Sequence, residues 1–256
     1  MTRIGASDAA LFLVSLRPLM IQLALETTGT SGSLAVLDGK TQLWDCRFGL
    51  LRRTAADIAC QLDASLRWCE DHGHTLRAIS VAVGPGSFTG LRIAITTAKT
   101  LAYALGVPVI PVGSLAAIAA VNLLENGAAN VLVGLNAYRR QVFAAEFSRD
   151  ELCRDNLIHR CNDRAEVCSK QDWDQRVAEK RGRSDWVIAG DRSIVADQVA
   201  ESLHHAEHCD AVGVGWVAAG LVAGSTSQPP ACFADPFSLE ARYLKLSAAE
   251  EKAASR

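Results

Sequence analysis

A glycine-rich stretch from Gly84 to Arg92 is the segment whose residue types point most directly to chemistry. It follows an apolar, β-branched run at residues 78–83 and leads into a long run rich in alanine, isoleucine and leucine. A strand, a glycine loop and a helix in that order can cradle an anion, because glycine permits positive φ and the helix presents free N–H groups. The alternative is a tight strand-to-helix turn without a ligand.

The glycine stretch differs from three common motifs for binding phosphate or presenting a nucleophile. A dinucleotide fingerprint would need its third glycine at position 89, where Thr89 stands. A P-loop would continue from Gly90 with lysine and a hydroxyl residue, and leucine and arginine follow instead. A nucleophile elbow would need glycine two residues before Ser87, where Pro85 stands. These differences disfavour a Rossmann enzyme, a Walker ATPase and an α/β-hydrolase.

Two histidines, His204 and His208, have the spacing that places two imidazoles on one face of a helix. Their segment is otherwise polar, so we expect a solvated helix end there rather than a metal site.

The composition fits a soluble globular protein of one large or two small domains in 256 residues, with 49% hydrophobic and 21% charged residues. The formal net charge of −2 lacks the basic excess of a stand-alone nucleic-acid-binding protein, so a function on RNA would act through a partner. No secretory signal is convincing, and no apolar run is as long as a membrane span. Eight scattered cysteines are interpreted as reduced thiols, which predicts a cytoplasmic location.

The first half of the chain is predicted to begin with a hairpin and then to alternate strands and helices. The expected strands, apolar runs bounded by turn residues, span residues 21–25, 32–37, 42–48, 78–83 and 107–112. The expected helices run from Thr54 to a stop at Gly73, from about 91 to 105, and from a cap at Ser114 to about 124.

The second half carries weaker signals. Strands are expected at residues 131–135, 141–147 and 186–189, and helices at 194–203 and 212–222. The segment from about 150 to 185 is predicted to be polar and irregular, and the tail after Ser247 is predicted to fray. A hairpin followed by strand–helix alternation indicates the α/β class.

The string Gly-Pro-Gly-Ser-Phe-Thr-Gly-Leu-Arg-Ile at residues 84–93, followed by an alanine-rich helix with Lys99, resembles the signature of TsaB (YeaZ-type) proteins. These are bacterial partners in making threonylcarbamoyladenosine on tRNA. Four further segments agree in residue type, at 21–28 with 33–37, 111–116, 136–139 and 242–245. The resemblance is dense from about Met20 to Phe147 and thin from there to about residue 238.

The resemblance implies a two-lobed actin/Hsp70/sugar-kinase-like fold with a reduced second lobe. We expect residues 1–19 to be a poorly ordered extension and residues 20–125 to form the first lobe with the glycine stretch. Residues 126–247 would form the second lobe, with the late helix at 212–223 as a candidate to return to the first. Residues 248–256 would be a polar tail.

The resemblance also argues against catalysis by this chain alone. Enzymes of that superfamily hold a hydrated Mg²⁺ with carboxylates from both lobes. Glu26 could supply one carboxylate, but Asn136 stands where the family usually has aspartate. Ser114 and Ile118 stand where catalytic TsaD-type relatives carry two histidines. Ser87 would need a histidine base to act as a peptidase nucleophile, and the segment before the first long helix lacks the one that family members often have.

Two alternatives remain for Glu26. It could hold a nucleotide with the glycine stretch, which would make the chain an ATPase or a small-molecule kinase, or it could organise the turn at residues 27–31. Any phosphate contact is expected to be weak, with no resident cofactor and no metal. The residues predicted for that contact are Glu26, Thr27, Thr28, Gly84, Pro85, Gly86, Ser87, Phe88, Thr89, Gly90 and Arg92.

The helix expected at 91–105 has two apolar or small faces. One carries Leu91, Ile95, Ala98, Ala102 and Leu105, and the other carries Ile93, Ala94, Thr97 and Ala104. Burial within the domain explains one face, and the other suits packing against helices of another subunit. The resemblance implies that this helix and the helix at 54–70 contact a TsaD-type paralogue, or a second copy of this chain when it is alone. The predicted interface residues are Ile58, Leu62, Leu66, Ile93, Thr97, Leu101 and Ala104.

The prediction is therefore a non-catalytic scaffold subunit of the machinery that forms threonylcarbamoyladenosine in tRNAs reading codons that begin with adenosine. It would pair with a TsaD-type catalytic subunit, and a TsaE-type ATPase would bind the pair. Contact with tRNA is expected only through the complex, and no membrane association is expected.

Overall fold

The apolar runs of the first half pair into a five-stranded sheet. The computed structural model describes residues 20–29, 31–49, 54–154, 158–160, 162–194, 208–225 and 230–245. The strands are β1 (Ile21–Glu26), β2 (Ser31–Asp38), β3 (Thr41–Gly49), β4 (Ala78–Gly84) and β5 (Val109–Gly113), in the order β3-β2-β1-β4-β5. The first three pair antiparallel as a meander, and β4 and β5 extend the sheet in parallel through helical crossovers. Such crossovers require helices on the faces of the sheet.

A four-stranded sheet forms in the second half, with the order β8-β7-β6-β9. Its strands are β6 (Asn130–Asn136), β7 (Gln141–Ser148), β8 (Glu166–Ser169) and β9 (Trp186–Gly190). The second sheet repeats the plan of the first, since an antiparallel meander (β6, β7, β8) is followed by a parallel edge strand. The α/β class expected from the sequence is confirmed.

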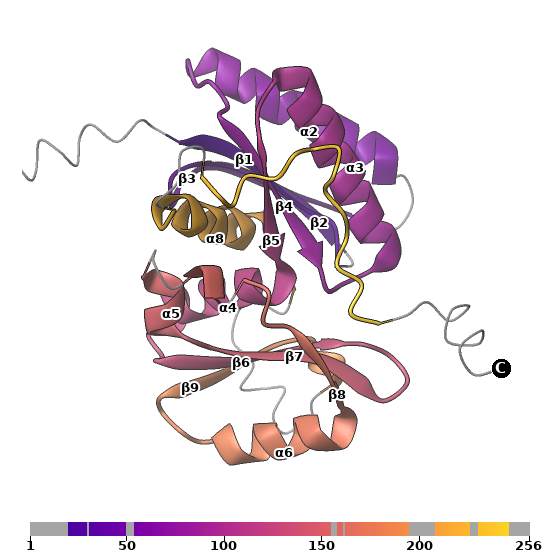
Figure 1. The fold of residues 1–256 in the computed structure, drawn as a ribbon, viewed down its shortest axis with the longest axis vertical. Helices are drawn as coiled ribbons and strands as arrows, with labels where there is room; N and C mark the ends of the chain where they lie inside the picture. Colours follow the sequence, from indigo (N-terminus) through magenta and orange to yellow (C-terminus); the bar gives the residue numbers. More distant parts are fainter. Residues whose placement is uncertain are drawn as a thin grey trace, which may run out of the picture.

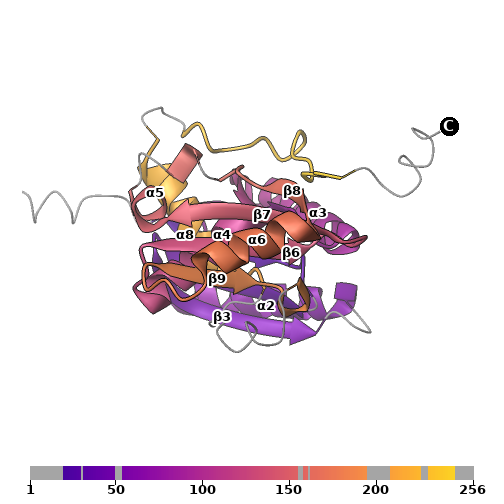
Figure 2. The same ribbon diagram turned by 90° about the horizontal axis from the view of Figure 1, so that it is seen from below.

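Helices and sheets alternate in layers (Figure 1). Helices α2 (Thr54–Asp71) and α3 (Phe88–Leu105) cover the outer face of the first sheet, and α6 (Lys170–Lys180) covers the outer face of the second. Between the sheets lie α4 (Ser114–Asn126), the short α5 (Arg149–Cys153) and α8 (Ala211–Ala223). Figure 2 shows α6 across the second sheet from below. Each sheet therefore has helices on both of its faces.

The central layer is tight because α8 is rich in small residues. A Cβ atom added at Gly213 would lie 2.5 Å from the carbonyl oxygen of Ala117 in α4. Helix α8 thus packs directly on α4 and on the inner face of β1 and β2, so a late segment of the chain completes the first core. Helix packing this close requires glycine at the contact.

A C-terminal strap, residues 230–245, crosses the first sheet beside α3 (Figure 1). Its Ala234 forms a bridge with Val109, and Leu239 is buried in the core between the first sheet and α3. Lys99 of α3 donates to the carbonyls of Phe237 at 3.2 Å and Leu239 at 3.0 Å. The end of the strap is fixed by the Arg242 N–H, which donates to the Val83 carbonyl at 2.8 Å.

Three local predictions were wrong. Helix α3 begins at Phe88 rather than near residue 91, because the Ser87 side chain accepts from the Gly90 N–H and caps it there. Ser114 does not cap α4; Gly113 is the N-cap residue and makes no side-chain cap bond. Leu105 is not part of the buried stripe of α3 and is 43% exposed, because it is the last residue before the left-handed Gly106.

The segment from 150 to 185 is more regular than its composition predicted. It contains α5, β8 and α6, and both helices begin with capping boxes, Ser148 with Glu151 and Ser169 with Asp172. Trp173 and Val177 lie one turn apart on α6, and both are buried against the second sheet. Two apolar positions in eleven gave too weak a periodicity to reveal the helix.

Several predictions concern residues outside the described ranges. They include the extension at 1–19, the helix at 194–203 beyond Ile194, His204, and the tail after Ser247. Among the described residues, no helix is long and apolar enough to cross a membrane. The seven cysteines within the described ranges are free thiols.

Candidate functional site: a helix groove beside a closed glycine loop

The glycine loop, residues 84–90, packs against the turn that follows β1 rather than around an open space. A Cβ atom at Gly90 would lie 1.8 Å from the carbonyl oxygen of Thr27, and one at Gly86 would lie 2.5 Å from Cβ of Thr28. The Ser87 N–H donates to the Thr28 carbonyl at 3.0 Å, and the Thr27 hydroxyl donates to the Gly90 carbonyl at 2.7 Å. The glycines therefore allow two backbone segments of this chain to meet closely.

Glu26 is fully buried at the end of β1 and faces the same turn. Its Oε1 accepts from both the N–H and the hydroxyl of Thr28. Among the described residues, its Oε2 finds no hydrogen-bond partner. Burial raises the pKa of Glu26 to about 7, and the nearby Asp210 carboxylate adds to the rise. The two hydrogen bonds from Thr28 connect the Glu26 carboxyl group to the first part of the turn.

A segment at the start of α8 covers the Glu26 turn from the other side. Asp210 forms an ion pair with Arg47 at 2.5 Å and caps α8 by accepting from the Val212 N–H at 2.7 Å. The Ala211 N–H donates to the Ser33 hydroxyl at 2.9 Å. No local pattern in the sequence connects residues 47 and 210, which are 163 positions apart. This contact leaves the Glu26 carboxylate enclosed by protein.

Both polar atoms of the Asn136 side chain are hydrogen-bonded to residues of the second lobe. Its Nδ2 donates to the Ser193 hydroxyl at 3.2 Å, and its Oδ1 accepts from the Tyr138 N–H at 2.8 Å. The side chain therefore shapes the β6–β7 turn. Within the described residues, no group of three or more histidine, cysteine, aspartate or glutamate side chains is placed to hold a metal ion.

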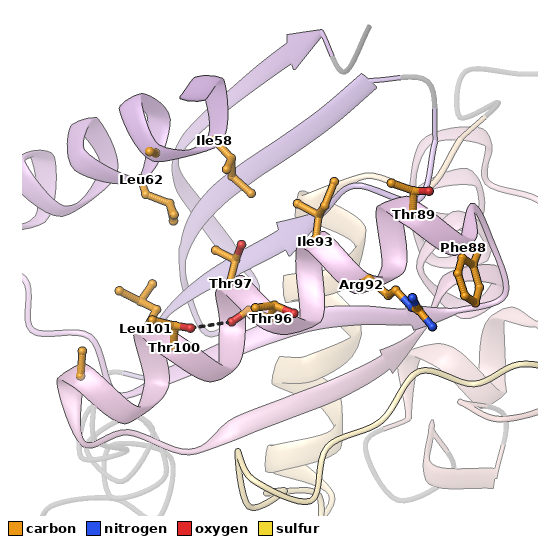
Figure 3. A pocket seen from close by; sticks show the side chains of 12 residues that line it. Ile58, Leu62, Phe88, Thr89, Arg92, Ile93, Thr96, Thr97, Thr100 and Leu101 are labelled. Atoms are coloured by element: carbon orange, nitrogen blue, oxygen red, sulfur yellow. Dashed lines mark hydrogen bonds between the residues drawn. The ribbon is translucent and has the colours of Figure 1, made fainter. Parts of the chain in front are cut away.

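A groove of about 730 Å³ lies between α2 and α3 on the outer surface of the first lobe (Figure 3). Its described lining is apolar apart from threonine hydroxyls and one guanidinium at the end, and no acidic side chain is among these lining residues. The lining residues are Ile58, Ala59, Leu62, Phe88, Thr89, Arg92, Ile93, Thr96, Thr97, Thr100, Leu101 and Ala104.

Six of the seven residues predicted for a partner interface line this groove, and Leu66 does not. The buried face of α3 holds Leu91, Ala94, Ile95, Ala98 and Ala102, so Ala94 belongs to the core face rather than to the second face. The second face, with Ile93, Thr97 and Leu101, is only partly covered. Small and β-branched side chains on a half-open helix face suit close packing by other helices.

Two threonines of α3 that line the groove, Thr96 and Thr100, were not among the predicted residues, and Thr89 was predicted only for the phosphate contact. Thr89, Thr96 and Thr100 lie on the rim of the groove, where the Thr100 hydroxyl bonds back to the Thr96 carbonyl at 2.9 Å. That bond, drawn in Figure 3, gives the Thr100 hydroxyl a hydrogen-bond acceptor within its own helix. The methyl group of the side chain is then left for contact with a partner. The four-residue spacing of Thr96 and Thr100, which places them on one face of the helix, was the signal available in the sequence.

Comparisons with known protein families and curated sequences identify the relatives of this chain. The family model described as TsaD, tRNA N6-adenosine threonylcarbamoyltransferase, matches residues 61–222, more than half of the chain. The protein named tRNA threonylcarbamoyladenosine biosynthesis protein TsaB from Escherichia coli is 41% identical over 76 residues, 30% of this chain and 33% of that protein. The protein of the same name from Bacillus subtilis is 35% identical over 101 residues, 40% of this chain and 44% of that one. The matches thus span less than half the length of these curated relatives.

Solved structures agree on the fold. A crystal structure of a protein with similarity to peptidase YEAZ from Pseudomonas aeruginosa superimposes with a TM-score of 0.66 at 22% identity, covering 89% of this chain and all of that one. A structure of YeaZ from the same organism gives a TM-score of 0.63 at 23% identity, covering 88% of this chain and all of that one. The expected α/β architecture with two sheets is confirmed, and its fold is that of these YeaZ structures.

Proposed function

Because the chain belongs to the TsaD family of tRNA N6-adenosine threonylcarbamoyltransferases and is of the TsaB/YeaZ type within it, we propose that it is a scaffold subunit for tRNA threonylcarbamoyladenosine synthesis. In this proposal the chain does no chemistry itself. It pairs through the α2–α3 groove with a TsaD-type catalytic subunit, or with a second copy of itself when alone. A TsaE-type ATPase then binds the pair, and tRNA is engaged by the whole assembly.

The observation that carries the proposal is the half-open face of α3 above the groove. Side chains such as Ile93 and Leu101 are only partly covered by α2, in a depression whose described lining residues include no aspartate or glutamate. Partly covered apolar side chains gain free energy when a partner removes them from water. The shape between two helices suits further helices packed in a bundle.

The geometry around Glu26 supports a role without catalysis. Its carboxylate is enclosed, and the N–H groups of Ser87 and Gly90 donate to the Thr28 carbonyl and the Ser87 hydroxyl. A nucleotide phosphate would have to displace these contacts to reach the helix terminus. Ser87 serves as the N-cap of α3, which gives its hydroxyl a structural role.

The test is assembly with the candidate catalytic subunit, using two adjacent substitutions. Ala104→Glu places a carboxylate in the groove, whereas Leu105→Glu places one a single position outside it. Both side chains are exposed in the isolated chain, so neither change should unfold it. We expect A104E to weaken the complex at least tenfold, about 1.4 kcal/mol, because a charge is buried without a partner, and L105E to leave it nearly unchanged.

Native mass spectrometry and titration calorimetry would measure the mass and affinity of the complex. If wild-type protein and a folded TsaD-type subunit do not associate, the proposal fails. Equal weakening by A104E and L105E would place the interface somewhere other than the groove.

A further inference from the structure

The β6–β7 turn holds three consecutive residues in an unusual backbone conformation. Tyr138, Arg139 and Arg140 have φ values of 58°, 51° and 60°, in the left-handed region that non-glycine residues seldom adopt. The Tyr138 N–H donates to Asn136 at 2.8 Å, and the Gln141 N–H donates to the Tyr138 carbonyl at 3.0 Å. The Tyr138 ring is 76% exposed. The turn therefore holds a tyrosine and two arginines at the molecular surface.

The end of the C-terminal strap lies beside this turn. Lys245 donates from Nζ to the Ala137 carbonyl at 3.2 Å. Two residues earlier, the Tyr243 ring lies 5.2 Å from that of Phe88, at the start of α3. The Arg92 guanidinium stacks over the other ring of that pair, 3.9 Å from the centre of Phe88. In Figure 1 the strap ends above the β6–β7 turn, close to the start of α3.

These three segments form one surface, which we name the arginine–tyrosine surface. Residues 84–92, 136–141 and 242–245 contribute no aspartate or glutamate. Arg242 pairs with the carboxylate of Asp163. The rings of Phe88 and Tyr243 are 47% and 49% exposed. The cations of the surface are Arg92, Arg139, Arg140, Arg242 and Lys245.

We propose that the arginine–tyrosine surface contacts a single-stranded loop of RNA when the chain is assembled with its catalytic partner. The inference rests on the proposed function, which makes the substrate of the assembly a tRNA. Cations would hold phosphates, and the exposed rings would stack on unpaired bases. Phe88 and Arg92 also line the α2–α3 groove, so an RNA loop here would lie at the edge of the partner-binding face.

RNA fits this surface better than a protein segment does. The exposed rings of Tyr138, Phe88 and Tyr243 are accompanied by arginines and a lysine, the combination that binds a strand with both a charged backbone and flat bases. The net charge of −2 predicts that the isolated chain binds RNA weakly and that the surface acts as one part of a larger site.

The experiment measures RNA affinity of the assembled complex with a matched pair of double variants. R139G/R140G removes two cations, and glycine adopts the left-handed backbone readily, so the turn should keep its shape. R154Q/R183Q removes two exposed arginines near the opposite end of the second sheet, beside α5 and before β9. The probe is a fluorescently labelled RNA hairpin with the sequence of a tRNA anticodon arm, titrated by anisotropy at several salt concentrations.

We expect R139G/R140G to bind the hairpin roughly tenfold more weakly, with the slope of log K against log salt reduced by about 1 to 2. R154Q/R183Q should bind within about twofold of wild type, because those cations lie away from the surface. Tyr138→Gly should also weaken binding but leave the salt slope unchanged, because it removes stacking rather than charge. This pattern would support RNA contact.

Three results would overturn the proposal. The first is unchanged hairpin binding in R139G/R140G, and the second is an equal loss of binding in the control variant. The third is loss of the protein complex itself in R139G/R140G, because that result would assign the surface to a protein partner. Complex mass is measured first, so failure of assembly by the wild-type chain is recognised as failure of the proposed function. In that case hairpin binding is measured with the isolated chain at low salt. The proposal of RNA contact then requires that R139G/R140G binds the hairpin more weakly than wild type.

Discussion

The glycine loop leads into α3 and the α2–α3 groove runs along the outer face of that helix. The two regions differ in what covers them. At the start of the helix, Gly90 lies against the Thr27 carbonyl and Gly86 against the Thr28 side chain, and the neighbouring Glu26 is fully buried. Along the outer face of the same helix, Ile93, Thr97 and Leu101 line an open groove. A motif that resembles an anion cradle in sequence is thus filled by its own chain. The less conspicuous side chains further along the helix remain available.

This difference indicates how one helix can serve two purposes. Its N-terminal turn fixes α3 to β1 through backbone hydrogen bonds, which sets the position of the helix precisely enough to present a surface. Its outer face then needs only small and β-branched residues to accept a partner. Rigidity at one end and an open face along the side are both properties of a scaffold.

The largest effect on stability is expected from a substitution that forces the glycine loop away from the turn after β1. Gly90→Ala would place a Cβ atom 1.8 Å from the Thr27 carbonyl oxygen, and backbone cannot move aside as a flexible side chain can. We expect a loss of about 3 kcal/mol or more in the free energy of unfolding, measured by urea denaturation. Gly49→Ala is the matched control, since a Cβ atom there has no neighbour within 4 Å, and it should change stability by less than about 0.5 kcal/mol. Similar stabilities for the two variants would mean that the loop is not closed.

A smaller effect is expected from the buried carboxyl of Glu26. Its pKa is about 7 in the folded chain, against an ordinary value of 4.5. Between these values the folded chain keeps a proton that the unfolded chain releases, so the free energy of unfolding should fall as pH rises from 4.5 through 7. The contribution is about 2 to 3 kcal/mol between pH 5 and pH 8.

Glu26→Gln should remove this part of the pH dependence, as measured by denaturant unfolding across the range. Glu151→Gln is the control. Arg164 lowers the pKa of Glu151 to about 2, so its contribution to stability is lost only as pH falls below its ordinary value of 4.5. The stability of E151Q should therefore keep the wild-type slope between pH 5 and pH 8. If wild type and E26Q have the same slope, the carboxyl is ionised and exposed to solvent.

Strands with long apolar runs could be predicted from the sequence almost to the residue. The strand predicted at 78–83 is β4 at Ala78–Gly84, because a run buried on both faces is apolar throughout. Helix α6 could not be predicted, because Trp173 and Val177 alone face the core and its start depends on the capping box at Ser169. The polar composition of this segment led to the expectation of irregular structure. Local hydrogen bonds of the capping box stabilise a helix there instead.

The candidate site was predictable where it depends on helical periodicity, and not where it depends on tertiary contact. The spacing of Ile93, Thr97, Leu101 and Ala104 placed them on one face, and they line one groove. Two contacts join residues more than a hundred positions apart: the ion pair of Arg47 with Asp210 and the hydrogen bond from Lys245 to Ala137. No local sequence pattern predicts them. The enclosure of Glu26 depends on such contacts.

The most direct test compares backbone hydrogen exchange in three samples: the chain alone, with Mg-ATP, and with a TsaD-type subunit. In the isolated chain the Ser87 and Gly90 amides should already exchange slowly, and Mg-ATP should leave them unchanged, because they donate within the chain. The catalytic subunit should slow exchange in α2 and α3 around the groove. Protection of the glycine loop by Mg-ATP, with no change in α2 and α3 on adding the subunit, would contradict the account.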